Sequence, residues 1–257
     1  MAGTFRTLVV LLGALLWFPL PAYALDPIDT DGPDFVESSE VVPKGRFQYE
    51  IDMTSVRDLR PASAGTAVST PTLLRYGATD HLEIRIAPEG FIRQGGMSGT
   101  GDIALGIKWH SHDGSPYPGN AAVSWILHVD TPSGSDRFRG NGLRPSLRSV
   151  ITWDLPFGLA LGVMPGVKSD TRADGHRFAS AIFGSVLNKR INNRFRVFGE
   201  LSVPQVARSA NGGVLADWDL GAAYLVTPDL QVGIRAGIAA NRNSPTSYTL
   251  LELAQRF

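Results

Sequence analysis

Residues 101–110, GDIALGIKWH, decide the fold, because their side chains alternate in character with a period of two. The odd positions are apolar and most even positions are polar or small: Ile103, Leu105, Ile107 and Trp109 against Asp102, Ala104, Gly106, Lys108 and His110. A helix would scatter the apolar residues around its surface, whereas a strand places them all on one face. The stretch therefore predicts a β-strand with one apolar face and one polar face.

The same alternation recurs along most of the chain from Arg46 onwards, for example in RFQYEIDM (46–53) and HLEIRIA (81–87). We predict about twelve strands of about 9–13 residues, which is the reach of a tilted strand across a bilayer. Two of them alternate poorly, one because it contains Pro71 and the other because FASAIFGSVL (178–187) is apolar on both faces. The expected ranges are 45–57, 66–77, 81–88, 101–111, 120–131, 143–154, 157–168, 176–188, 193–204, 213–225, 229–241 and 246–257.

The links between these strands alternate between short and long. GATDH (77–81) and DLPFG (154–158) are tight turns, whereas PEGFIRQGGMSGTG (88–101) and TPSGSDRFRGNG (131–142) are long. SHDGSPYPGN (111–120) is the exception, because it is long where a short turn is expected. This order is typical of a transmembrane antiparallel β-barrel with short periplasmic turns and longer outer loops. An even number of strands places the first and the last strand's free ends, and so both chain termini, on the periplasmic side.

A secreted β-sandwich is the alternative, because its strands alternate as well. The expected strands are longer than is usual in a sandwich, and aromatic residues stand near their ends as in the girdle of a membrane barrel: Trp109, Trp125, Trp153, Phe157 and Tyr224. The chain ends on Phe257, on the apolar parity of its last strand. A terminal aromatic of this kind resembles the signal read by the barrel assembly machinery, which we expect as a partner alongside the outer-membrane lipids.

The N-terminal residues indicate export. Arg6, an apolar run and the sequence AYA before Leu25 predict a signal peptide over residues 1–24. Residues 25–45 form an acidic, Pro-containing tail on the periplasmic side, either a loose linker or a segment packed against the barrel, and residues 46–257 form the barrel. With no cysteine and a formal net charge of zero, the chain has no disulfide framework and no basic excess for nucleic acid.

Ionic residues collect on the second parity of the strands, with acids and bases in about equal number. This pattern predicts either a polar pore or a narrow lumen filled by ion pairs. The arginines among them favour anionic or aromatic solutes. Our pore-lining candidates from this face are Glu50, Asp52, Asp102, Lys108, Arg144, Arg148, Arg194 and Arg196.

Catalytic and metal-binding signatures are weak. His110 and His112 in HSHD (110–113) share a strand face, but two histidines are too few ligands, so we expect no metal site. No GxSxG elbow occurs, and GGMSGTGD (95–102) makes no nucleotide fingerprint. We expect neither an enzyme nor a cofactor, with a barrel hydrolase as the enzymatic alternative.

Several phrases carry a family resemblance, among them DGPDFVESSEVVPKGRFQYE (31–50), GDIALGIKWH and FRGNGLRPSLRSVITWDLPFGLALGVMPGV (138–167). In these the chain resembles the outer-membrane transporter family named for the MetA pathway of phenol degradation. The resemblance implies a transmembrane barrel that moves small, often aromatic, molecules. FRGNGLRPSLR (138–148) adds Arg139 and Asn141 to Arg144 and Arg148 as solute-contact candidates. We expect a passive outer-membrane channel, or else a structural or adhesive barrel with a filled lumen.

Overall fold

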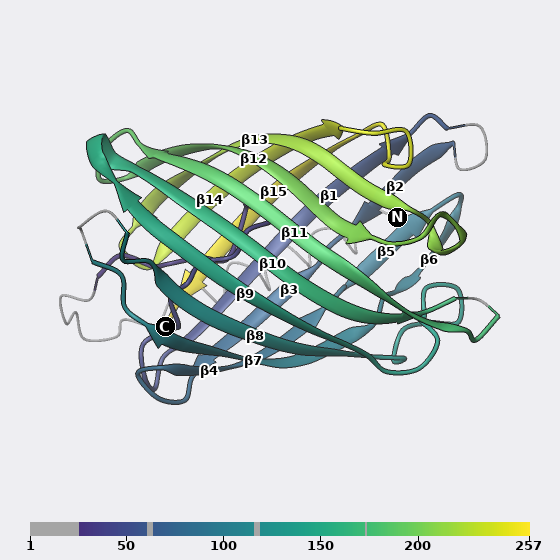
Figure 1. Ribbon diagram of the computed structural model, residues 1–257, viewed down its shortest axis with the longest axis horizontal. Helices are drawn as coiled ribbons and strands as arrows, with labels where there is room; N and C mark the ends of the chain where they lie inside the picture. The colour runs from purple at the N-terminus through teal and green to yellow at the C-terminus, as the bar shows by residue number, and fades with distance from the viewer. Residues whose placement is uncertain (1–25, 61–63, 116–118, 173) are drawn as a thin grey trace, which may run out of the picture.

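A computed structural model describes residues 26–60, 64–115, 119–172 and 174–257, and the expected signal peptide lies outside them. The described residues form one antiparallel sheet rolled into a barrel (Figure 1). Its segments are β1 (Phe47–Asp58), β2 (Gly65–Ser69), β3 (Thr72–Gly77), β4 (Leu82–Pro88), β5 (Phe91–Gln94), β6 (Met97–Thr100), β7 (Ile103–His112), β8 (Ala122–Thr131), β9 (Arg144–Leu155), β10 (Leu159–Thr171), β11 (Arg177–Arg190), β12 (Phe195–Val206), β13 (Val214–Thr227), β14 (Leu230–Ala239) and β15 (Ser247–Arg256). Two 3₁₀ turns, Pro156–Gly158 and Ser209–Asn211, lie in connections.

Pairing of β15 with β1 closes the sheet, so the predicted barrel is confirmed. Three pairs of segments, β2 with β3, β4 with β5 and β6 with β7, are each one kinked strand, which gives the twelve strands expected. Pro71 breaks the first of them, because proline has no N–H for the ladder. Gly90 breaks the second with a φ of 67°, a backbone conformation that favours glycine.

The stretch 88–101, which we expected to be a loop, continues the sheet instead. Phe91–Gln94 and Met97–Thr100 form the hairpin β5–β6, and β5 also pairs with β2. Two glycines at 95 and 96, both with positive φ, make its turn. The sequence hid this hairpin because its glycines and polar residues interrupt the alternation.

The two ends of the barrel differ in the length of their connections. We call the end with the short connections 78–81, 156–158, 191–194 and 228–229 the turn end, and it also carries the longer link 113–121. The opposite end, with the connections 59–64, 95–96, 132–143, 172–176, 207–213 and 240–246, is the loop end. The C-terminal Phe257 lies at the turn end, where its ring stacks on Phe47 and Tyr49 at 6.4 and 6.0 Å between centroids.

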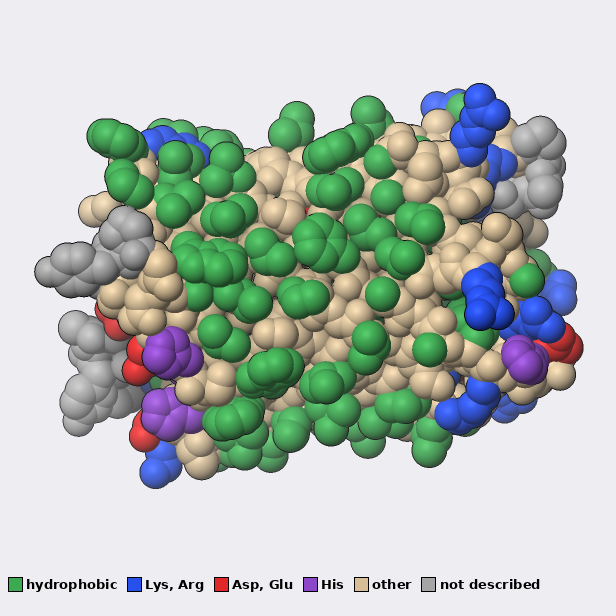
Figure 2. All heavy atoms as spheres, in the orientation of Figure 1, with side chains coloured by type: hydrophobic (Ala, Val, Ile, Leu, Met, Phe, Trp, Pro, Cys, Tyr) green, Lys and Arg blue, Asp and Glu red, His purple; other side chains and the backbone are tan. Residues whose placement is uncertain are grey.

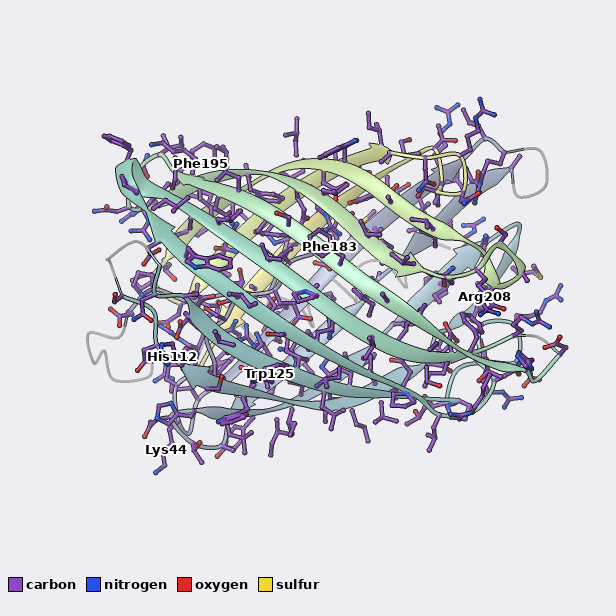
Figure 3. The ribbon with its side chains drawn as sticks, in the orientation of Figure 1. Lys44, His112, Trp125, Phe183, Phe195 and Arg208 are labelled. Carbon is purple, nitrogen blue, oxygen red and sulfur yellow. The ribbon has the colours of Figure 1, made fainter. Side chains whose placement is uncertain are left out.

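The outer face of the barrel is apolar between these ends (Figure 2). Leu105, on the apolar parity of the stretch that predicted the fold, is 51% exposed, whereas Ala104 beside it is buried. Trp109 and Trp125 pair across β7 and β8 near the turn end, and the side chain of Trp125 points away from the barrel (Figure 3). No helix among the described residues is long and apolar enough to cross a membrane.

The inner face has two different walls. The charged wall, on β1, β3, β4 and β7, presents Gln48, Glu50, Arg75, Glu83, Arg85 and Lys108, all buried. The apolar wall, on β8 to β12, presents Ile126, Val150, Met164, Val186 and Phe198, which form one buried cluster. This explains why FASAIFGSVL lacks alternation, because Ile182 and Val186 on β11 point inward as well as being apolar.

Candidate functional site

The N-terminal tail, residues 26–45, lies inside the barrel (Figure 1). It begins at the turn end, where the N–H of Ile28 donates to the carbonyl of Pro228 at 2.7 Å. It leaves at the same end, where Lys44 bridges to Gly77 just before β1. Between these points it rises into the lumen and returns. The sequence was compatible with either a loose linker or a segment packed against the barrel, and in the structure the tail is packed against the inner wall of the barrel.

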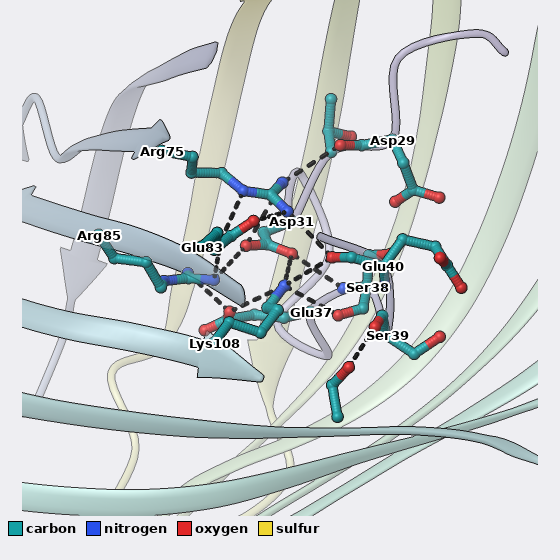
Figure 4. A network of polar contacts seen from close by, with 12 residues as sticks. Asp29, Asp31, Glu37, Ser38, Ser39, Glu40, Arg75, Glu83, Arg85 and Lys108 are labelled. Carbon is teal, nitrogen blue, oxygen red and sulfur yellow. Dashed lines mark hydrogen bonds and ion pairs between the residues drawn. The ribbon is translucent and has the colours of Figure 1, made fainter. Parts of the chain in front are cut away.

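The turn of the tail is held by its own acids (Figure 4). Asp31 lies 2.7 Å from Nη1 of Arg85 and 3.5 Å from Nη1 of Arg75, and it also receives a hydrogen bond from Nζ of Lys108. Oε2 of Glu37 lies 2.7 Å from the other terminal nitrogen of Arg85, Nη2. Because all three wall bases are buried, these contacts compensate charges that the barrel alone would leave exposed to a low dielectric.

Glu37 also reaches across the lumen to Arg148 on β9, at 2.5 Å. Burial opposes ionisation of Glu37, but Arg148 and Arg85 outweigh it and lower the pKa of its carboxyl to about 2. Burial likewise opposes ionisation of Asp31, and Arg75, Lys108 and Arg85 hold its pKa well below the ordinary value. Both tail acids are therefore charged at neutral pH.

A second set of contacts has the opposite polarity, with wall carboxylates binding the main chain of the tail. Glu50 accepts the N–H groups of Asp31 and Gly32 at 3.0 and 3.1 Å. Glu200 on β12 accepts those of Phe35 and Val36 at 2.8 and 2.7 Å. These bonds satisfy buried amides that no strand partner reaches. They also fix the path of the tail independently of its side chains.

The tip of the tail packs on the apolar wall. Val36 is buried in the cluster on β8 to β12. A Cβ atom added at Gly184 would come within 2.6 Å of the Val36 side chain, and one at Gly162 within 3.1 Å. Both glycines therefore provide the space that the tip occupies. Asp34, next to the tip, pairs with Arg196 at 2.8 Å.

The tail leaves part of the lumen empty. A cavity of about 900 Å³ lies between the tail and the strands of the apolar wall, and it reaches the turn end at Asn193 and Arg194. Apolar positions such as Ala160 and Val186 line it together with Arg190 and Arg196. Six acidic residues, Asp29, Asp34, Glu37, Glu40, Asp113 and Asp154, line the same cavity as the arginines. The cavity thus offers an apolar side together with charged groups of both signs to a molecule inside it.

Four of the predicted lumen residues contact the tail. Glu50, Lys108, Arg148 and Arg196 are all inward-facing, as expected, and each binds a tail residue. Arg194, in the turn 191–194, is exposed and lines the cavity. Of the two lumen alternatives left open by the sequence, these contacts show the ion-paired filling on the charged wall, with space remaining opposite.

Two further candidates form a clamp near the loop end. Asp102 accepts the N–H groups of Gly134 and Gly140, each at 2.8 Å, and Nη2 of Arg144 at 2.7 Å. These bonds fold the loop 132–143 over the barrel mouth. Asp52 faces the lumen, and its Oδ1 has no hydrogen-bond partner among the described residues.

The four candidates in FRGNGLRPSLR do not form one site. Arg148 binds the tail and Arg144 belongs to the clamp, whereas Arg139 is 48% exposed and pairs with Asp136 at 3.0 Å. The amide of Asn141 donates to the carbonyl of Arg172 in a neighbouring loop at 3.1 Å. The segment therefore runs from the outer mouth to the middle of the lumen.

His110 and His112 do not share a face, contrary to our expectation. A bulge between them in the pairing of β7 with β8 turns His112 outward at the turn end, where it contacts Asn120 (Figure 3). The alternation rule failed here because one extra residue reverses the parity beyond it. Among the described residues, no group of three or more His, Cys, Asp or Glu side chains is placed to hold a metal ion.

Ser124, His110 and Asp113 line up near the turn end in the manner of a catalytic triad. His110 lies 2.7 Å from Asp113 through Nε2 and 3.3 Å from the hydroxyl of Ser124 through Nδ1. Ser124 is fully buried, however, and its hydroxyl donates to the carbonyl of Ser39, which also lies 2.8 Å from Nδ1 of His110. Both groups thus hold a tail carbonyl, and the serine is not free to attack a substrate.

The tail contacts were the part of the site that sequence reasoning missed. Asp31, Asp34 and Glu37 are spaced by three residues in a stretch without strand or helix periodicity. Their signal was the acidic character of the tail beside a lumen rich in arginine. Only the fold shows which acid meets which base, because the partners lie 44 to 162 residues apart.

The fold is that of known outer-membrane barrels. An outer-membrane channel from Pseudomonas putida F1 matches with a TM-score of 0.65 and 14% identity, over 85% of this chain and 98% of that one. The NanC porin matches with a TM-score of 0.55 and 13% identity, over 81% and 97%. The KdgM porin matches with a TM-score of 0.52 and 11% identity, over 81% and 99%.

The chain thus has the closed fold of barrels from the outer membrane of Gram-negative bacteria. We expect the turn end to face the periplasm and the loop end to face outside. No curated protein matches the chain in sequence. A family model matches residues 30–257, which include most of the tail and all of the barrel. The chain therefore belongs to the family described as "Putative MetA-pathway of phenol degradation".

Proposed function

We propose that this protein is a passive channel for small solutes, aromatic ones among them, across the outer membrane. The observation that carries the proposal is the cavity of about 900 Å³ left between the tail and the apolar wall. A volume of this size is within the range of sites for small organic molecules. A lumen that served only as a packed core would leave no such space.

The lining of the cavity supports the class of solute. Ala160 and Val186 offer apolar contact, while Arg190, Arg194 and Arg196 stand on the same cavity. Guanidinium groups bind carboxylates through paired hydrogen bonds and stack on aromatic rings. A small aromatic molecule with a polar group can contact the apolar positions with its ring and the charged residues of the lining with the polar group, whereas a sugar has no apolar ring face of that size for the apolar wall.

The tail regulates how much of the lumen such a solute reaches. Val36 seals the tail against the apolar wall at mid-height, and the cavity lies on its periplasmic side. Passage from outside therefore requires the tip to shift away from Gly162 and Gly184. The ion pairs on the opposite wall then serve as the hinge on which the tail remains attached.

A second candidate function, a structural barrel, is favoured by the same tail. Ion pairs and backbone hydrogen bonds fill the charged wall from Glu50 to Lys108 as a polar core would. This candidate predicts no flux through the full-length protein under any condition. It also predicts that weakening the tail contacts destabilises the barrel without opening it.

Liposome swelling with the full-length protein separates the two. Benzoate and an uncharged sugar of similar mass are compared as the osmotic solute. We expect faster swelling with benzoate, and a reduced rate in the variant Arg194→Gln, because Arg194 lines the cavity. Swelling at the rate of empty liposomes for both solutes would support the structural barrel and exclude the channel.

A further inference from the structure

The positive charge of this neutral protein is concentrated at its outer end. The six connections of the loop end contain six arginines and two acids: Arg60, Arg137, Arg139, Arg172, Arg208 and Arg242, against Asp136 and Asp174. The five connections of the turn end contain one arginine and three acids: Arg194, against Asp80, Asp113 and Asp229. On the face shown in Figure 2, Lys and Arg side chains gather around the loop end, the end at which Figure 3 labels Arg208. An anionic partner outside the cell fits this asymmetry.

Two further arginines, in strands near the loop end, project from the outer face of the barrel and not from its mouth. Arg57 shares the outward parity of β1 with Met53, which is 58% exposed, and is itself exposed. Arg93 shares the outward parity of β5 with Phe91, which is 48% exposed. Neither arginine has an ion-pair partner within the part of the chain that the structure describes. Each therefore presents a free guanidinium directly above an apolar surface.

Arg57 stands at the height of a membrane interface. Ten residues separate Arg57 from Phe47, whose ring belongs to the aromatic group at the turn end. At about 3.3 Å per residue and a tilt of about 40°, that is about 25 Å, the height of the apolar band of an outer-membrane barrel. Arg57 thus lies where acyl chains end and head groups begin.

Arg57 and Arg93 are also close enough to bind one ligand together. Arg57 pairs in register with Thr66 of β2, and Val68 of the same strand pairs with Arg93. Two strand spacings of about 4.8 Å and an offset of two residues put their Cα atoms about 12 Å apart. Both side chains can reach one head group that carries two anionic groups, with the exposed hydroxyl of Thr66 between them.

We propose that Arg57 and Arg93, on the outward face of β1, β2 and β5, form a binding site for the phosphorylated glycolipid of the outer leaflet. The guanidinium groups bind its phosphates through charge-assisted, paired hydrogen bonds. Met53 and Phe91 contact its acyl chains below. The site lies on the outside of the wall, so it is independent of the lumen and of the proposed transport.

The test uses the purified full-length protein in detergent and two lipids, diphosphorylated lipid A and the same lipid with both phosphates removed. Bound lipid is counted by native mass spectrometry. The double variant Arg57→Gln/Arg93→Gln is compared with Lys189→Gln, which removes an outward-facing base at the turn end. Because both positions of the double variant are exposed, it is expected to keep the heat-resistant folded band of the wild type in gels.

We expect the wild type and Lys189→Gln to retain diphosphorylated lipid A. The double variant should bind this lipid at least about ten-fold more weakly than the wild type does. The dephosphorylated lipid should bind all three proteins equally and weakly. Equal retention of diphosphorylated lipid A by the double variant and the wild type would overturn the site. So would binding by the wild type that does not depend on the phosphates.

Discussion

Oδ2 of Asp31 lies 2.7 Å from Nη1 of Arg85, although 54 residues separate them in the chain. This pair joins a tail without regular secondary structure to the middle of a transmembrane strand. Its burial makes it sensitive to the loss of either partner, because an unpaired charge would remain in the lumen.

Removing two tail acids should release the tail. In Asp31→Asn/Glu37→Gln, Arg148 loses its ion-pair partner and the buried Arg85 keeps only Glu83 of its described partners. Breaking a buried pair costs about 3–5 kcal/mol. We expect a conductance in planar bilayers that is higher or flickers more than that of the wild type. Glu40→Gln is the control, because this exposed acid forms no ion pair among the described residues. Identical traces for the double variant and the wild type would contradict the role of these pairs.

A bulkier residue at Gly184 should displace the tip of the tail by another route. A Cβ at this position would lie 2.6 Å from Val36, so Gly184→Val forces the tip off the apolar wall. We expect faster liposome swelling with little loss of barrel stability. Gly199→Val is the matched control, since a Cβ there meets only Leu220, at 3.5 Å. Faster swelling in the control as well would point to a general loosening of the barrel.

The sidedness of the barrel can be read with introduced thiols, because the protein has no cysteine of its own. We expect Ser209→Cys, in a connection of the loop end, to react with a membrane-impermeant maleimide in intact cells. Thr227→Cys, at the turn end, should react only after the outer membrane is permeabilised. Both positions are exposed, so differences in labelling report the side of the membrane. The reverse order of reaction would invert the assigned topology.

The parity of β7 predicts opposite environments for neighbouring residues. Leu105→Arg should destabilise the barrel in a lipid-refolding assay by about 2–4 kcal/mol, the cost of an arginine in the middle of the bilayer. A spin label at position 105 should be relaxed by oxygen dissolved in lipid. A label at position 104, on the lumen side, should respond instead to a water-soluble relaxing agent. Equal response of both labels to the water-soluble agent would be incompatible with a membrane barrel.

The aromatic seam at the C-terminus should matter for assembly. Phe257 exchanges main-chain hydrogen bonds with Phe47 at 2.7 and 3.3 Å and stacks on its ring, where β15 meets β1. We expect Phe257→Ala to lower the fraction of heat-resistant barrel in outer-membrane preparations, through loss of this stack and of the proposed contact with the assembly machinery. Phe157→Ala removes an aromatic at the same end that is 88% exposed, and should have little effect. An undiminished folded fraction for Phe257→Ala would remove the seam from the assembly pathway.

Local periodicity predicted the barrel because the alternation of a strand depends only on consecutive residues. It placed Leu105 outward and Lys108 inward, and both are confirmed. It failed where geometry depends on distant partners or on single irregularities. The bulge before His112 and the hairpin β5–β6 are single irregularities. A glycine pair or one extra residue does not show in the alternation of apolar and polar residues.

The filling of the lumen depends on partners that are distant in the sequence. The sequence shows that Arg85 and Lys108 face inward, but not that Asp31 is what they meet. Likewise, Val186 reads as an outlier in a polar face until Val36 is found against it. Inward apolar residues in a membrane barrel are therefore evidence that a segment from elsewhere in the chain packs inside.

The tail enters and leaves the lumen at the same end and is continuous with β1, so the barrel carries a covalently attached ligand of its own. A ligand joined by a short linker acts at an effective concentration of about millimolar, whatever the amount of protein in the membrane. A solute at micromolar concentration that binds Arg85 or Arg148 would not displace the tail unless it replaces several of the tail's contacts at once. The threshold for such competition is then set by the covalent link at Lys44 and Gly45, and it does not change with expression level.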